Sequence, residues 1–193
     1  MRRICVFCGS RPGTRPEYAE AAKAMGRALV ENGIGLVYGG GRVGLMGIVA
    51  DAAMRAGGEV IGVIPEALMR REVGHGGVTE LRVVGSMHER KALMADLSDG
   101  FVAMPGGYGS IEEFCEVITW SQLGIHPKPC GLLNVSGFYG PLLAMFDYAV
   151  AEGFVPPQHR TLVLEDTTPA GLIEKLRRFT PPVTEKWILP GER

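Results

Sequence analysis

Short runs of apolar and β-branched residues alternate along the chain with longer segments in which apolar residues recur at helical spacing. The apolar runs predict strands at Arg3–Cys8, Ile34–Tyr38, Glu59–Ile64, Glu80–Val84, Gly100–Met104, Cys130–Val135 and Thr161–Leu164. The periodic segments predict helices at Pro16–Asn32, Leu45–Arg55, Met87–Leu97, Ser110–Leu123, Gly140–Glu152 and Pro169–Phe179. This alternation predicts an α/β fold, in which a doubly wound, Rossmann-like and mostly parallel sheet carries helices on both faces.

The chain has 193 residues, a length that suits one domain. No repeat and no linker divides it, so we expect a single α/β domain over residues 1–179. Residues 180–193 are rich in proline and predict a C-terminal tail.

Charge and composition exclude several classes of protein. The net charge of −1 argues against a general nucleic-acid-binding protein. No apolar run reaches the 18 residues of a membrane span, and the start of the chain lacks the pattern of a signal peptide. Cys5 and Cys8 have the spacing of a redox or zinc motif, but they lie in an apolar strand with no second ligand pair, which favours structural thiols. We therefore expect a cytoplasmic protein without a metal site.

Glycine is about twice as frequent as in average proteins, with 28 residues, and it gathers after predicted strands. Gly39, Gly41 and Gly44 match the G-x-G-x-x-G pattern between a strand and a helix. A dinucleotide site would place this pattern in the first strand–helix unit and an acid at the end of the next strand, where Glu59 instead begins the strand. The loop fits either a phosphate cradle, with Gly40 and Gly41 as contacts, or a tight turn.

A second glycine-rich loop, residues 105–110, joins the strand ending at Met104 to a helix. Ser110 and Glu113 have the spacing of a capping box, which would give Glu113 a structural role on a solvated helix face. A carboxylate beside an anion-binding loop also suits a reaction in which positive charge develops or a water molecule is activated. The spacing leaves both interpretations open.

The third element is Ser86–Lys91, which begins a helix after a predicted strand. Arg90 and Lys91 have no acidic residue three or four positions away, so they are either solvated cations or a phosphate clamp. The clamp predicts that Arg90→Ala loses activity with little change in melting temperature. His88 fits a capping or packing role at least as well as a catalytic one.

Together these elements resemble the Lonely Guy (LOG) family. The resemblance covers roughly residues 3 to 155 and rests on these runs: Cys8-Gly9-Ser10, Tyr38-Gly39-Gly40-Gly41, Gly44-Leu45-Met46-Gly47, Met87-His88-Glu89-Arg90-Lys91 and Pro105-Gly106-Gly107-Tyr108-Gly109-Ser110-Ile111-Glu112-Glu113. Later runs at 117–120, 124–126 and 131–135 extend it. Ser110 stands where the family usually has Thr, a change that keeps the hydroxyl group.

The resemblance implies a phosphoribohydrolase that cleaves the N-glycosidic bond of N6-modified adenosine 5′-monophosphates, releasing the free base and ribose 5-phosphate. Arg90 and Glu113 would be the catalytic pair. The nucleotide contacts that the resemblance implies are Lys91, Glu72, Gly106, Gly107, Tyr108, Gly109, Ser110, Ile111 and Glu112. It implies no metal or organic cofactor. It also implies a homodimer or larger homo-oligomer, and the apolar residues Trp120 and Leu123 just past the catalytic motif could form part of an interface.

Similar proteins carry the label lysine decarboxylase, which would need a lysine bound to pyridoxal phosphate. None of the lysines lies in a pattern that indicates such a site. A different class, a non-catalytic nucleotide- or cofactor-binding protein on the same fold, stays open because fold alone does not fix function.

Overall fold

The computed structural model describes residues 1–72 and 74–182, apart from the side chains of residues 70–72. The strands are β1 (Arg3–Phe7), β2 (Gly35–Tyr38), β3 (Val60–Pro65), β4 (Glu80–Val84), β5 (Gly100–Ala103), β6 (Cys130–Leu133) and β7 (Val163–Asp166). The helices are α1 (Pro16–Glu31), α2 (Gly44–Arg55), α3 (Glu66–Glu72), α4 (Met87–Asp96), α5 (Tyr108–Gln122), α6 (Gly140–Ala151), α7 (Pro157–Arg160) and α8 (Pro169–Arg178), with a 3₁₀ turn, η1, at Val135–Gly137.

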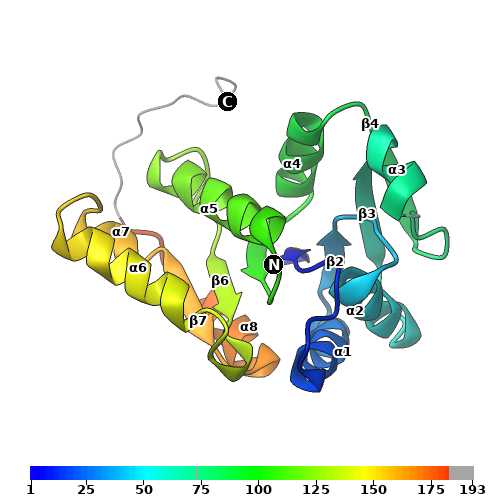
Figure 1. Ribbon diagram of the computed structural model, residues 1–193, viewed down its shortest axis with the longest axis horizontal. Helices are drawn as coiled ribbons and strands as arrows, with labels where there is room; N and C mark the ends of the chain where they lie inside the picture. The colour runs from blue at the N-terminus through cyan, green and yellow to red at the C-terminus, as the bar shows by residue number, and fades with distance from the viewer. Residues whose placement is uncertain (73, 183–193) are drawn as a thin grey trace.

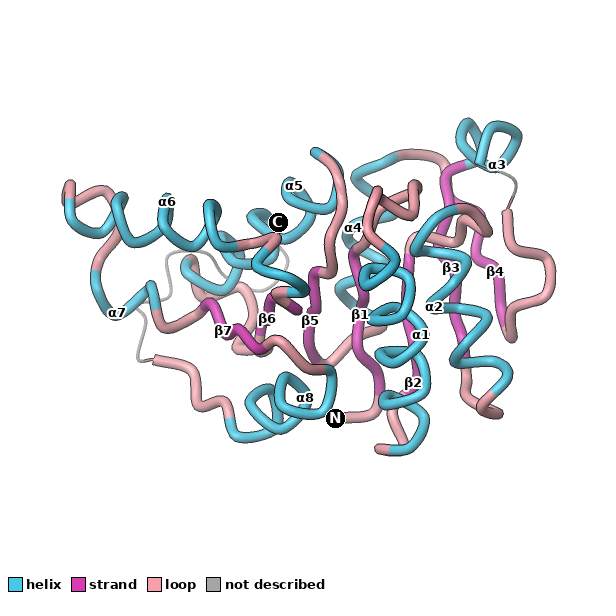
Figure 2. The backbone as a smooth tube through the Cα atoms, turned by 60° about the horizontal axis from the view of Figure 1, so that its bottom comes forward, coloured by secondary structure: helices cyan, strands magenta, loops and turns pink. Residues whose placement is uncertain are grey.

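The strands of the described residues form one parallel sheet in the order β4-β3-β2-β1-β5-β6-β7. The helices α1, α2 and α8 cover one face, while α4 and α5 cover the other, as Figure 1 shows. Figure 2 shows α6 at the outer end of the layer that contains α5. Each face has its own apolar core, so β1, β2, β3, β5 and β6 are buried on both sides, whereas the edge strands β4 and β7 are partly exposed. The predicted α/β fold is confirmed.

The N-terminal strand lies in the middle of this sheet. β1 pairs with β2 on one side and with β5 on the other. Strands β2 to β4 are added outward on one side of β1 and β5 to β7 on the other, so the strand order reverses between β1 and β5. In doubly wound sheets, ligands bind at the carboxyl ends of the strands next to this reversal. The glycine-rich loops after β2 and β5 and the start of α4 all lie at that edge.

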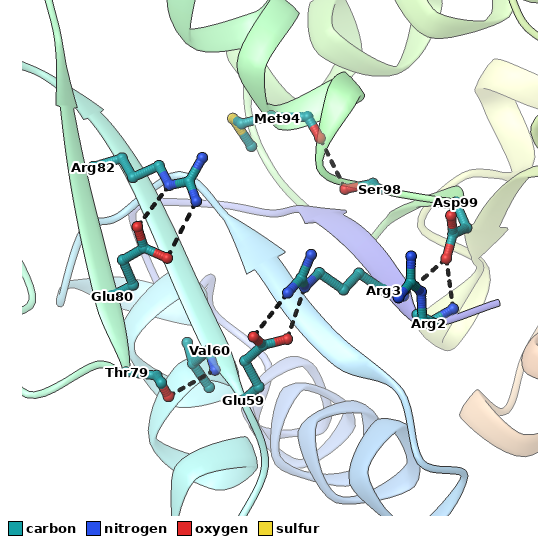
Figure 3. A network of polar contacts seen from close by, with 10 residues as sticks. All are labelled: Arg2, Arg3, Glu59, Val60, Thr79, Glu80, Arg82, Met94, Ser98 and Asp99. Atoms are coloured by element: carbon teal, nitrogen blue, oxygen red, sulfur yellow. Dashed lines mark hydrogen bonds and ion pairs between the residues drawn. The ribbon is translucent and has the colours of Figure 1, made fainter.

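At the opposite end of the sheet, where the strands begin, ion pairs and hydrogen bonds to the backbone join neighbouring strands (Figure 3). Arg3 donates to both carboxylate oxygens of Glu59 at 2.7 and 2.9 Å, and the Asp99 carboxylate accepts from the backbone N–H groups of Arg2 and Arg3. These contacts join the starts of β1, β3 and β5. Glu59, considered for a ligand role in a dinucleotide site, therefore lies at the edge away from the ligand-binding loops.

Each predicted strand and helix is present, and most ends agree within one or two residues. The last strand is displaced: it runs from Val163 to Asp166 rather than from Thr161 to Leu164. The pattern also missed the short helices α3 and α7, whose few residues give periodicity little length to act on. The predicted tail begins at residue 180, and all of it beyond residue 182 lies outside the described residues.

Helices α1 and α2 cross closely at Gly26, and this contact gives a prediction about stability. A Cβ atom at Gly26 would lie 2.6 Å from the Val49 carbonyl oxygen and 2.9 Å from the Ala52 Cβ. Gly26→Ala is therefore expected to lower the free energy of unfolding by ~1–3 kcal/mol, although alanine is the better helix former. The matched control is Gly140→Ala at the start of α6, where no atom lies within 4 Å of the added Cβ. Thermal melting that ranks Gly26→Ala at or above Gly140→Ala would contradict the close crossing.

Candidate active site

A hollow of about 300 Å³, here called the site hollow, lies at the carboxyl ends of the strands. Its lining residues are Cys8, Gly9, Ser10, Met46, Leu68, Met87, Arg90, Gly107, Tyr108, Gly109, Ser110, Glu112 and Glu113. The lining combines apolar side chains, bare glycine backbone and one buried pair of opposite charges. Such a combination is typical of a binding site for a small ligand with a charged group.

Arg90 is buried beneath the glycine-rich loop that follows β2. Ser86 begins α4 by accepting a hydrogen bond from the Glu89 N–H, which places Arg90 one turn into the helix. Its guanidinium donates to the Val63 carbonyl at 3.1 Å, to Glu113 at 2.8 Å and to the Gly39 carbonyl at 3.5 Å. A Cβ at Gly39 would lie 2.2 Å from Arg90 Nη2, so a larger residue there would displace the guanidinium from this position.

Glu113 on α5 is the partner of Arg90. The two side chains are 10% and 8% exposed, and only Oε1 of Glu113 bonds to the guanidinium. Among the described residues no hydrogen bond goes to Oε2, although the carboxyl group borders the site hollow. Burial raises the pKa of Glu113, while the positive charge of Arg90 opposes that shift. One oxygen is thus held and the other is available to a ligand.

The predicted capping box at Ser110 and Glu113 is wrong. Helix α5 begins at Tyr108, two residues earlier than predicted, and Gly107 is its N-cap without a side-chain cap. Ser110 and Glu113 are therefore inside the helix, and both are buried. The assignment of Glu113 to a solvated face was also wrong, for a different reason: Glu113 is buried against Arg90, which belongs to another helix. The capping alternative for Glu113 is removed.

Lys91, the neighbour of Arg90, is held by two carboxylates of α5. Its ammonium donates to Glu112 at 2.6 Å and to Glu116 at 2.9 Å. Burial lowers the pKa of Lys91, but these two hydrogen bonds outweigh it, so the pKa lies above the ordinary lysine value. Arg90 and Lys91 thus both have acidic partners on α5. The sequence prediction considered only neighbours along one helix and did not find these partners. Two cations and three carboxylates leave one negative charge in excess when all are ionised.

The first turn of α5 has the features of an anion-binding element. Gly107, Tyr108 and Gly109 are exposed, and the backbone N–H groups of a helix's first turn have no partner within the helix. The positive end of the helix dipole adds to their attraction for a phosphate. These groups lie about one helical turn from Glu113, so a ligand whose phosphate bound there could also reach the Glu113 carboxylate.

The structure brings together only part of the predicted contact set. Arg90, Glu113, Gly107, Tyr108, Gly109, Ser110 and Glu112 line the site hollow. Lys91 and Ile111 lie beside it without lining it, and Gly106 faces the neighbouring hollow described below. Glu72 is the last residue of α3, and its side chain is outside the described part. His88 is exposed.

Gly40 and Gly41 do not reach the site hollow. The Gly40 carbonyl accepts from the His75 N–H at 2.9 Å, and Gly41 forms a bridge to Gly74. The two glycines thus join their loop to residues 74–75, which favours the tight-turn interpretation over the phosphate cradle. As ligand contacts they stay a prediction.

Several lining residues were missed as site residues. Gly9 and Ser10 follow β1 at the strand reversal, and Met46, Leu68 and Met87 form an apolar wall. Position at the end of β1 could have identified the first two. No sequence signal separates the three apolar residues from core residues, because their role depends on which face of each helix meets the hollow.

Other kinds of site find little support in the described residues. In residues 1–72 and 74–182 no group of three His, Cys, Asp or Glu side chains could hold a metal ion. None of the helices in these residues combines the length and the hydrophobicity that a membrane span requires. Cys5 and Cys8 are buried free thiols, and burial raises the pKa of each.

Fold and geometry define an α/β protein with a candidate small-ligand site at the strand reversal, built from a helix N-terminus and a buried arginine–carboxylate pair. The family model described as "Possible lysine decarboxylase" matches residues 46–176, and the chain belongs to this family, which includes the LOG proteins. The probable cytokinin riboside 5′-monophosphate phosphoribohydrolase LOGL9 of Oryza sativa subsp. japonica is 57% identical over 94% of this chain and 80% of its own length. The cytokinin riboside 5′-monophosphate phosphoribohydrolase LOG3 of Arabidopsis thaliana is 53% identical over 94% of this chain and 84% of its own length.

Solved structures agree on the fold. The molybdenum cofactor carrier protein of Chlamydomonas reinhardtii superposes with a TM-score of 0.71 at 24% identity, covering 92% of this chain and 96% of that one. At this identity the match supports the architecture alone. The resemblance to the LOG family is confirmed by the relatives of higher identity.

Proposed function

We propose that this protein hydrolyses the N-glycosidic bond of adenosine 5′-monophosphate or its N6-modified forms, releasing the free base and ribose 5-phosphate. The observation that carries the proposal is the buried Arg90–Glu113 pair beside the free N-terminus of α5. Relatives of more than half identity are named phosphoribohydrolases, which agrees with this chemistry.

The reaction breaks the bond between ribose C1′ and the base nitrogen. The bonding electron pair leaves with the base, which gains a proton, and a water oxygen forms the new bond to C1′. Positive charge develops on the sugar in the transition state, as in other glycoside hydrolyses. Glu113 lines the hollow, and its Oε2, which accepts no hydrogen bond from a described residue, would stabilise that charge or orient the water while Arg90 holds Oε1. On this proposal Arg90 is chiefly a positioning residue.

The rest of the hollow would bind the two unreactive parts of the nucleotide. The first turn of α5 would hold the 5′-phosphate, and binding energy gained there orients the sugar against Glu113. The apolar side chains of Met46, Leu68 and Met87 suit a purine ring with an apolar substituent.

The decarboxylase description of the family model does not fit this site. Pyridoxal phosphate chemistry needs a lysine amine that forms a Schiff base, and an amine does so only when deprotonated. Among the described lysines, Lys91 lies nearest the hollow, and its two carboxylate partners keep it protonated. The residues present therefore do not fit that cofactor.

The deciding experiment is incubation of the purified protein with AMP and with N6-isopentenyl-AMP, followed by chromatography for free base and ribose 5-phosphate. Release of both products in equal amounts supports hydrolysis. Binding of either nucleotide without release of base would favour the non-catalytic alternative that the sequence left open.

We further propose a homodimer that associates through α6. This helix is mostly apolar, yet Leu143 is its one buried residue, and Met145, Tyr148 and the following Phe154 are 58%, 59% and 84% exposed. Trp120 and Leu123, the residues that first suggested an interface, are half-buried. A second copy of the chain would cover this face.

The dimer gives a prediction for sedimentation velocity. The wild-type protein is expected to sediment as a dimer at micromolar concentration, and Met145→Asp with Tyr148→Asp is expected to yield a folded monomer. Val83→Asp, a matched change at an exposed apolar residue of β4, should leave the dimer intact. A wild-type monomer at every concentration would contradict the proposal.

The compartment we propose is the cytoplasm. The proposed substrate is an intracellular nucleotide, and Cys5, Cys8, Cys115 and Cys130 are all free thiols.

A further inference from the structure

A second hollow, of about 600 Å³, adjoins the site hollow on the far side of the β1 and β5 loops. Gly9, Ser10, Gly107 and Tyr108 line both hollows. The other walls of the second hollow belong to it alone, and among them are Arg11, Tyr18 and Phe138. The hydrolysis proposed above uses none of these three residues.

The loops after β1 and β5 separate the two hollows, and two of the four shared residues are glycines. The Gly9 N–H donates to the Pro105 carbonyl at 3.1 Å, so the loops after β1 and β5 are joined directly. A Cβ at Gly106 would lie 2.2 Å from the Ser110 Oγ and 2.9 Å from the Gly9 nitrogen, so the two loops and α5 pack closely here. Gly107, which lines both hollows, has no atom within 4 Å of an added Cβ, so its missing side chain leaves open space in which a flat ligand can approach the backbone.

The opposite wall is aromatic and fixed in place. Tyr18 of α1 and Phe138 after η1 meet edge to face, with ring centroids 5.8 Å apart. The neighbouring Tyr139 packs edge to face against Phe138 and donates its hydroxyl to the Met104 carbonyl at 2.6 Å. The wall is thus anchored to the end of β5 and offers an aromatic surface to a planar ring.

Arg11 supplies a cation at the rim. It is exposed, and it makes no hydrogen bond or ion pair with a described residue. Its planar guanidinium suits bidentate binding of a phosphate or carboxylate. Glycine backbone, an aromatic wall and an uncommitted cation together select a planar ring that carries an anionic group.

We propose that the second hollow binds a second molecule of nucleoside monophosphate, with its base against Tyr18 and Phe138 and its phosphate on Arg11. The choice of a nucleotide within the class of anionic aromatic ligands rests on the proposed function, whereas the hollow and its chemistry do not. Because four residues line both hollows, the two binding events are coupled through the first turn of α5.

The test is the number of AMP molecules bound per chain, measured by equilibrium dialysis with radiolabelled AMP. Glu113→Gln serves as the parent because it should bind AMP while consuming it slowly. We expect two AMP per chain in this parent and one after the further change Arg11→Glu. Arg15→Glu, which reverses another exposed arginine of the same segment that does not line the hollow, should leave two.

The aromatic wall is tested in the same way. Tyr18→Ala in the parent should reduce the count to one, and Tyr18→Phe, which keeps the ring, should preserve two. One AMP per chain in the parent, no bound AMP, or a second molecule that persists in Arg11→Glu, would each overturn the inference. If Tyr18→Ala does not fold, the number of AMP molecules bound by Arg11→Glu decides whether the inference holds. Failure of the proposed function is measured separately, as absence of free base from the wild-type enzyme.

Discussion

Glu113→Gln should reduce turnover of AMP by about 100-fold or more, the scale expected when a positioned acid–base group is removed. Glutamine keeps the shape of the side chain and an oxygen that accepts from Arg90, but it carries no charge to stabilise the ribosyl cation. Nucleotide affinity should change little, because the proposed phosphate and base contacts lie elsewhere in the site hollow. Turnover, AMP affinity and thermal melting of the variant together measure this separation.

The matched comparison is Glu112→Gln, one residue earlier on α5. Glu112 is more than half exposed and pairs with Lys91, so its pair is worth no more than ~1 kcal/mol and its loss should reduce turnover by less than about tenfold. Turnover near the wild-type value in Glu113→Gln would remove Glu113 from the mechanism, even for a proven hydrolase. Equal losses in both variants would point to bulk charge on α5 rather than to one carboxylate.

Arg90→Ala should abolish turnover and also destabilise the protein. Removing Arg90 leaves Glu113 buried without its partner, which typically costs ~3–5 kcal/mol and corresponds to a fall in melting temperature of roughly 6–20 °C. This replaces the expectation of little change in melting temperature, which assumed a cation on the surface. Arg82→Ala, which breaks a more exposed pair with Glu80, should cost less than ~1 kcal/mol.

The destabilisation of Arg90→Ala should depend on pH with a definite sign. Burial raises the pKa of Glu113 in the folded protein above its ordinary 4.5, so its protonation favours the folded state. That contribution is complete below about pH 4.5 and is lost as the pH rises through the folded pKa. Without Arg90 the folded pKa rises further, so the gap to wild type should be larger at pH 8 than at pH 4.5. A gap that is constant with pH would exclude Glu113 as the cause.

Much of the fold could be predicted because parallel strands covered on both faces appear as short apolar runs with longer helical patterns between them. The first and last residues of helices and strands were harder to predict, and the start of α5 shows why this matters. Gly107 adopts an extended conformation and is the N-cap, so the helix begins at Tyr108, two residues before Ser110, and Ser110 and Glu113 lie inside it. Local spacing fits either start equally well.

Glycines after the strands and two cations without partners on their own helix pointed to the candidate site, but the contacts within it could not be predicted from sequence patterns along the chain. Arg90 lacks a partner on its own helix, and the structure supplies Glu113 from 23 positions away. Likewise, periodicity placed Glu113 among solvated residues because a helical wheel does not show a buried counter-charge. Pairing between helices depends on how the layers dock, which no local pattern records.

The central place of β1 also determines when the fold can be completed during synthesis. β1 pairs with β2 within the first 38 residues, but its other neighbour, β5, begins only at Gly100. A nascent chain that ends before residue 100 therefore exposes the middle of its future sheet as an open edge, which favours association with other chains. The Arg90–Glu113 pair forms later still, since α5 follows β5. Fragments that stop short of α5 should consequently aggregate rather than fold into a smaller, partly active domain.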